Sequence, residues 1–125
     1  MHPYPALAGQ RVQLPGHPEI YLVDDGGFRR WIPNPATYNN LFRDWNGVNV
    51  DIQTGDISLG HRISDGALLA KDPGTAPVWF IDHELHVKQW IASPAVMDKF
   101  YFDWAKIQSV PNSVLDAIFN GPSIT

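Results

Sequence analysis

The residues best suited to chemistry are tryptophans that directly follow polar side chains, and this combination occurs twice. Trp31 follows two arginines, and Trp90 follows a lysine and a glutamine. An indole face can stack on the apolar face of a sugar ring, while guanidinium, ammonium and amide groups donate hydrogen bonds to its hydroxyls. The candidate ligand-binding residues on these two runs are Trp31, Trp90, Arg29, Arg30, Lys88 and Gln89.

A structural interpretation of the same residues stays open. The arginine pair can form the solvated face of a strand, or it can pair with the nearby carboxylates at positions 24 and 25. Trp31 and Trp90 suit an exposed and a buried position equally, because neighbours on a strand alternate between its faces. A second pair, Trp45 and Trp104, is expected in the core, since burying one indole removes roughly 150–250 Å² from water.

Asp44 and Asp103 stand directly before that second tryptophan pair. They are candidates to accept hydrogen bonds from sugar hydroxyls, and capping the next turn is an equally good use of both. They could also form the carboxylate pair of a glycoside hydrolase, but no spacing in the sequence fixes the distance between them. Phosphate-binding loops, nucleophile elbows and zinc-protease motifs do not occur, so we predict that the protein is not an enzyme.

His83, Glu84 and His86 invite a metal-binding interpretation. Histidines three positions apart point to opposite faces of a straight strand, and no third ligand is defined for zinc. We therefore predict no metal site and no cofactor.

These residues belong to a duplicated sequence. The first motifs are Tyr21-Leu22-Val23-Asp24, Trp31-Ile32, Pro35-Ala36 and Asp44-Trp45, and they recur as Trp79-Phe80-Ile81-Asp82, Trp90-Ile91, Pro94-Ala95 and Asp103-Trp104. Internal repeats indicate units that bury one another's apolar faces. We expect one compact domain over residues 1–125, built from repeats at 9–63 and 64–125.

Each repeat predicts a hairpin followed by a short helix. Strands are expected at residues 19–23 and 28–32, and again at 78–81 and 87–91. Asn34-Pro35 and Ser93-Pro94 are typical of a capped helix start, and each helix should end before the Asp-Trp pair. The fold class is therefore α+β, with two ββα-type repeats related by a pseudo-twofold axis.

The sequence after each helix is less regular. Residues 48–52 alternate as a half-buried strand should, and 107–110 repeat this weakly. Residues 53–57 predict a turn into a strand, whereas 112–118 predict a capped helical turn. Residues 63–69 are expected to connect the two units.

Composition limits the possible partners. Of the 125 residues, 44% are hydrophobic and 18% charged, which predicts a folded chain, and a net charge of −4 argues against nucleic-acid binding. The sequence has no apolar run long enough to span a membrane, so we expect no membrane insertion. The absence of cysteine does not indicate whether the protein lies inside or outside the cell. The first eight residues lack signal-peptide features, so we expect either a cytoplasmic chain or a fragment.

The second repeat resembles a repeat found in secreted and surface-exposed bacterial proteins. The resemblance is carried by Gly66-Ala67-Leu68-Leu69, the strand with Trp79, Lys88-Gln89-Trp90-Ile91, Ser93-Pro94, Phe102-Asp103-Trp104 and the closing Leu115-Asp116-Ala117-Ile118. Such repeats commonly lie beside hydrolase or cell-wall-associated domains. The resemblance implies an extracellular, non-catalytic accessory module that binds cell-wall or other glycans. The turn at 83–86 departs from it, since the family has a Gly-Lys turn there.

The leading interpretation is therefore a carbohydrate-binding module. The alternative is a structural or protein-interaction module whose aromatic residues lie in the core and whose surface docks a partner protein domain.

Overall fold

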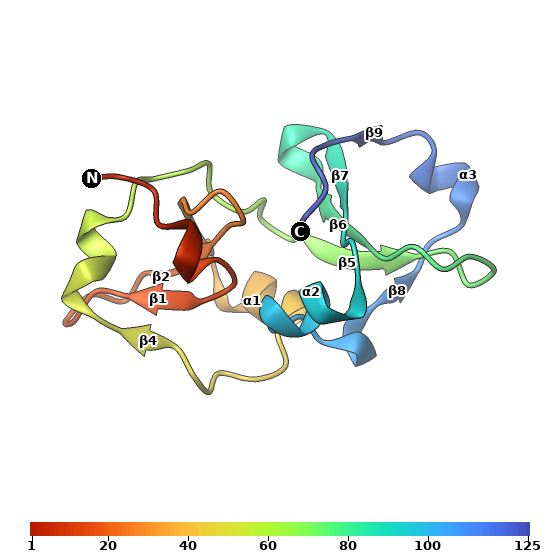
Figure 1. Cartoon of the computed structure of the whole chain (residues 1–125). Helices are drawn as coiled ribbons and strands as arrows, with labels where there is room; N and C mark the ends of the chain where they lie inside the picture. The colour runs from red at the N-terminus through yellow and green to blue at the C-terminus, as the bar shows by residue number, and fades with distance from the viewer.

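The computed structural model describes all 125 residues and has a mixed α+β fold with two sheets and three α-helices (Figure 1). The strands β1, β2 and β4 lie on one side of Figure 1 and β5 to β9 on the other, with α1 and α2 between them. None of the helices is both long enough and apolar enough to cross a membrane. The strands are β1 Arg11–Gln13, β2 Ile20–Val23, β3 Arg29–Trp31, β4 Asn49–Val50, β5 Leu68–Lys71, β6 Trp79–Asp82, β7 Val87–Trp90, β8 Gln108–Ser109 and β9 Phe119–Asn120; the helices are α1 Pro35–Leu41, α2 Pro94–Lys99 and α3 Asn112–Leu115.

The two sheets share a strand order. The first has the order β3-β2-β1-β4, and the second has β7-β6-β5-β8 with β9 added beside β7. In both, the hairpin strands are antiparallel and the last strand runs parallel to the first, as β1–β4 and β5–β8. The predicted hairpins are confirmed, whereas β1 and β9 were not expected and β5 falls at the end of the predicted connection. These missed strands have two to four residues, too few for a periodic pattern.

The helix starts follow the prediction. The Asn34 side chain accepts a hydrogen bond from the backbone N–H of Thr37 at 2.8 Å, and Ser93 accepts one from Val96 at 3.3 Å. In each case proline occupies the first helical turn, where its missing N–H is not needed. The two halves of the chain, residues 9–63 and 64–125, thus each continue from a hairpin into a short capped helix.

The segments after the helices differ from the prediction in part. The strand expected at 48–52 is reduced to β4, and both its residues are exposed rather than alternating, because β4 pairs at the sheet edge with β1 alone. Residues Ile52–Asp56 form a 3-10 helix whose start is capped by Asp51. The expected helical turn at 112–118 is present as α3; its N-cap residue Pro111 has no capping side chain, and the Asp72 carboxylate instead accepts from the Asn112 N–H at 2.8 Å.

In each half, a segment that follows the helix forms backbone hydrogen bonds with the second strand of the hairpin. The Gly60 N–H donates to the Arg29 carbonyl at 3.0 Å, and the Gly121 N–H donates to the Lys88 carbonyl at 2.8 Å. A Cβ at Gly60 would lie 3.1 Å from the side chain of Phe28, directly before β3, and one at Gly121 would lie 3.2 Å from that of Val87 on β7. Glycine is therefore the residue that lets the backbone approach this closely.

The main apolar cluster draws on both halves. It contains 16 buried residues, and Phe42 and Phe102 meet near its centre with ring centroids 5.7 Å apart. Their backbones also form an antiparallel bridge, and both side chains have no exposed area. Two short sheets cannot bury their apolar faces separately, so this shared cluster holds the halves together.

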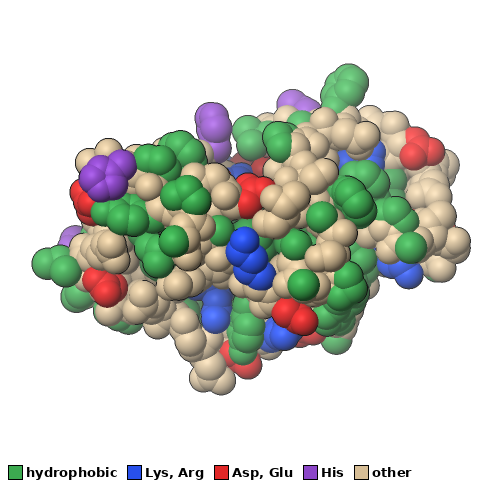
Figure 2. All heavy atoms as spheres, in the orientation of Figure 1, with side chains coloured by type: hydrophobic (Ala, Val, Ile, Leu, Met, Phe, Trp, Pro, Cys, Tyr) green, Lys and Arg blue, Asp and Glu red, His purple; other side chains and the backbone are tan.

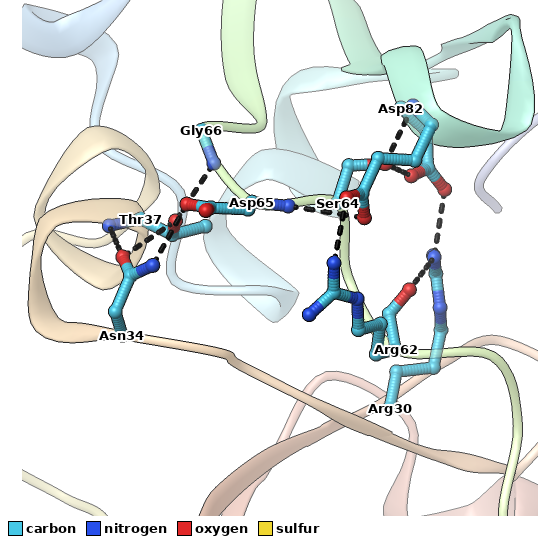
Figure 3. A network of polar contacts seen from close by, with 9 residues as sticks. Arg30, Asn34, Thr37, Arg62, Ser64, Asp65, Gly66 and Asp82 are labelled. Carbon is cyan, nitrogen blue, oxygen red and sulfur yellow. Dashed lines mark hydrogen bonds and ion pairs between the residues drawn. The ribbon is translucent and has the colours of Figure 1, made fainter.

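A buried polar network also joins the halves (Figure 3). Arg30 Nη2 donates to Asp82 Oδ2 at 2.7 Å, and Ser64 donates to the other oxygen of the same carboxylate. Farther along the connection, Asn34 donates to Asp65 at 2.7 Å. The expected pairing of Arg30 with nearby carboxylates is wrong, because its partner comes from the second hairpin and the ion pair is almost fully buried.

We expect Phe102→Ala to lower the free energy of unfolding by about 3–5 kcal/mol, because it opens a cavity where the two halves meet. Urea unfolding followed by circular dichroism measures this change. Phe119→Ala is the matched control, since Phe119 is 78% exposed and its loss should cost less than about 0.5 kcal/mol. Equal stabilities for the two variants would contradict a shared core centred on Phe102.

Candidate functional site

The first half carries a groove between the hairpin and the start of α1. It has a volume of about 330 Å³, and we call it groove one. Its floor is formed by Ile32 and Tyr38, and its walls carry Trp31 and Trp45. The complete lining is Pro18, Glu19, Ile20, Trp31, Ile32, Pro33, Asn34, Pro35, Tyr38 and Trp45.

The second half carries a groove of about 370 Å³ in the corresponding place, which we call groove two. Its floor is formed by Val78, Ile91 and Met97, and its walls carry Trp90 and Trp104. The complete lining is Ala76, Pro77, Val78, Trp90, Ile91, Ala92, Ser93, Pro94, Met97 and Trp104.

The two grooves correspond residue by residue. Every residue that lines groove one has a counterpart in groove two, 58 positions later before the hairpin turn and 59 positions later after it. The change from 58 to 59 reflects the extra residue in the turn of the second half. The same positions therefore form a concave, tryptophan-walled surface in both halves.

All four groove tryptophans are partly exposed. Trp31 and Trp90 keep 36% and 43% of their surface accessible, and Trp45 and Trp104 keep 46% and 47%. The expectation that Trp45 and Trp104 lie in the core is wrong. Trp45 lies flat on Tyr38 with ring centroids 3.8 Å apart, so the protein covers one indole face while the ring stays at the surface.

Hydrogen bonds of its hydroxyl group hold Tyr38 in the floor of groove one. The Tyr38 hydroxyl donates to the Asp44 carbonyl at 2.6 Å and accepts a hydrogen bond from Arg11, also at 2.6 Å. Burial raises the pKa of Tyr38, against the opposing effect of Arg11. The Trp45 indole N–H donates to Asn39 at 2.9 Å, which fixes the ring in its plane. These contacts hold the stacked rings of Tyr38 and Trp45 in place.

A further pocket adjoins groove two and was not expected from the sequence. It has a volume of about 340 Å³, and Pro77 and Trp90 line both spaces. Trp79 forms its other aromatic wall, and Asn120 and Ser123 supply polar groups. Trp79 lies directly across the hairpin from Trp90, which puts both side chains on one sheet face. This cross-strand pairing was the available signal for Trp79.

The polar candidates next to the tryptophans do not line the grooves. Arg29 and Lys88 are buried, and they donate to the carbonyls of Ile57 and Ile118, each at 2.8 Å. The cations also lie 4.7 Å from the rings of Tyr21 and Trp79. The solvated strand face considered for the arginine pair is therefore wrong for Arg29.

The remaining strand candidates have structural partners as well. Arg30 is held by Asp82, and the Gln89 side chain donates to the Pro122 carbonyl at 2.9 Å. Neither residue lines groove one, groove two or the adjoining pocket. Of the strand residues predicted to bind ligand, Trp31 and Trp90 are the two that reach the grooves.

Asp44 and Asp103 both cap turns. Asp44 accepts from the Asn46 N–H at 2.9 Å, and Asp103 accepts from the Ala105 N–H at 2.9 Å. Asp44 also accepts from the Tyr101 hydroxyl at 2.7 Å, and this bond lowers the pKa of the Asp44 carboxyl. The carboxylates hold the backbone on which Trp45 and Trp104 stand, and the capping interpretation is confirmed for both.

The histidine turn forms a 3-10 helix over His83–Leu85. Glu84 pairs with Arg62 at 2.7 Å, and it also accepts from the Asp65 N–H. No group of three histidine, cysteine, aspartate or glutamate side chains is close enough to hold a metal ion. Figure 2 shows acidic and basic side chains interspersed on the displayed face, without a large patch of one sign.

Comparison with protein-family models, curated proteins and solved structures gives no match to this chain. Function is therefore inferred from the chemistry of the grooves themselves.

We expect iodide to quench the tryptophan fluorescence of the folded protein substantially, because four indoles keep more than a third of their surface accessible. Stern–Volmer titration measures the effect. Replacing Trp45 and Trp104 together by phenylalanine should lower the quenchable fraction. Quenching that stays negligible until the protein is unfolded would show that the indoles are interior.

Acid should weaken the contact between the halves. A hydrogen bond from Arg43 lowers the pKa of Asp98, as Tyr101 lowers that of Asp44, and both bonds cross from one half to the other. A lowered folded-state pKa stabilises the protein above the unfolded pKa of about 3.9, and this stabilisation is lost as pH falls through the folded value. We expect Asp44→Asn combined with Asp98→Asn to destabilise at pH 7 and to flatten the decline in the urea midpoint between pH 5 and 3. An unchanged decline would contradict this assignment.

Proposed function

We propose that this protein is a non-catalytic module that binds carbohydrate in groove one and groove two. The observation that carries the proposal is the paired exposure of Trp31 with Trp45 and of Trp90 with Trp104, in grooves with corresponding linings. Monomeric proteins seldom leave large aromatic surfaces open without a binding role. Flat indoles suit the apolar faces of sugar rings, and open grooves suit chains that continue past the site.

The polar groups at the grooves support the same ligand class. Glu19 lines groove one, Ser93 lines groove two, and Asn120 and Ser123 line the adjoining pocket. A few placed polar groups around an apolar platform fix the orientation of a ligand, as sugar hydroxyls require. In the second half, Trp104, Trp90 and Trp79 follow one another along two contiguous pockets, which favours an oligosaccharide over a single sugar.

We further propose that the two halves descend from a duplication and are related by an approximate twofold axis. The common strand order and the corresponding grooves support this relation. Two sites on one rigid chain would raise the avidity for a polymer well above the affinity of either site. An extracellular or cell-surface location, beside cell-wall glycan, follows from the family resemblance and fits such a polymer-binding role.

The competing function is a protein-interaction module. The sequence-based version of this alternative places the aromatic residues in the core, whereas the four groove tryptophans are partly exposed. A second form of this function is tested as well, because aromatic-lined grooves also bind extended proline-rich peptides, and both grooves have tryptophan walls.

A glycan array should identify oligosaccharides that bind, and titration calorimetry should then give two sites per chain. We expect Trp31→Ala and Trp90→Ala each to weaken one site by about tenfold or more, because the stacking platform is lost. The double variant should lose measurable binding while keeping its circular dichroism spectrum.

Ile52→Ala is the matched control, since Ile52 is 81% exposed and lies outside both grooves. It should bind like the wild type. Equal binding by the wild type and the double tryptophan variant would remove these rings from the mechanism. Binding of proline-rich peptides without any glycan would instead favour the protein-interaction module.

A further inference from the structure

We infer that groove one selects a sugar bearing a free, protonated amine, whereas groove two takes neutral sugars. This inference rests on the proposed function and assigns a ligand class to each site. It depends on Glu19, which is the one charged residue in the lining of either groove.

Glu19 has no partner within the protein. It is partly buried beside the groove, and no lysine, arginine or histidine nitrogen lies within 4.0 Å of its carboxylate. The surface acids Asp98 and Glu84, by contrast, are each paired with an arginine. No side-chain hydrogen bond reaches Glu19 either, so its oxygens are free to accept donors from a ligand.

Asn34 and Tyr38, two other polar side chains of groove one, are already hydrogen-bonded within the protein. Asn34 donates to Asp65 and accepts from Thr37, and the Tyr38 hydroxyl is shared between Arg11 and Asp44. The ligand must therefore meet the Glu19 carboxylate with donors of its own. An ammonium group offers three donors and no acceptor, which matches this demand.

The tryptophans favour the same charge. Trp31 and Trp45 present exposed indoles to the groove that Glu19 lines, and indole faces attract cations through the ring quadrupole. A carboxylate and two indoles around one apolar floor form a site for an organic cation. A sugar with a free amine satisfies both features at once, since its ring stacks and its ammonium pairs.

Groove two lacks this charge. The counterpart of Glu19 is Pro77, and no residue that lines groove two or its adjoining pocket is charged. The indole pair is nevertheless retained as Trp90 and Trp104. The difference between the grooves is therefore one of charge on a similar platform.

Titration calorimetry with two probes tests the inference: glucosamine tetramer with free amines, and the same tetramer fully N-acetylated, at pH 5.5 in low salt. We expect the wild type to bind the amine form about tenfold more tightly at one site, consistent with a charge-assisted hydrogen bond. Glu19→Gln should abolish that preference while leaving the N-acetylated probe unaffected. Pro77→Glu should create the preference in groove two.

Asp116→Asn is the matched control, because Asp116 is exposed and lines neither groove. This substitution changes the net charge by the same amount as Glu19→Gln. It should keep the preference. If the wild type binds both tetramers equally and Glu19→Gln alters neither, this inference fails while the proposed function stands. If no glycan binds at all, the proposed function fails and takes this inference with it. A lysine peptide bound more tightly than the amine tetramer would overturn the assignment to a sugar.

Discussion

The shared apolar core between the two halves is the constraint on which the rest of the molecule depends. Phe42 and Phe102 join the backbones at its centre, and the same cluster of 16 residues supplies the groove floors through Ile32, Tyr38 and Met97. The residues that form each groove floor thus belong to the core that holds the two halves together. The shape of the proposed binding sites and the stability of the fold cannot be separated.

Several parts of this arrangement were predictable because their causes are local. Asn34 and Ser93 precede proline, so the helix starts follow from the chemistry of one cap and one ring. The hairpins follow from short runs of strand-forming residues around a turn. The α+β class could therefore be predicted, whereas β1 and β9 could not, since they have only three and two residues and pairing with another segment defines them.

The candidate site was harder to predict because burial depends on tertiary partners. Arg29 and Lys88 look like solvent-facing donors in the sequence, yet carbonyls 28 and 30 residues later bind them inside the protein. Trp45 looks like a core residue, yet Tyr38 already fills the space behind it and leaves the indole at the surface. The sequence identifies the residue types at the site, and their exposure comes from packing between segments far apart in the chain.

The two grooves have matching tryptophans and differ in charge. The four tryptophans hold matching places, so both grooves present an aromatic platform of similar size. Their surroundings differ where a ligand's polar groups would meet them, as Glu19 against Pro77 and Tyr38 against Met97. A similar platform with different charge would give two sites the same ring-stacking chemistry and different selectivity. Because one core fixes both platforms, a polymer carrying both kinds of sugar would engage the second site at a high effective concentration once the first is filled.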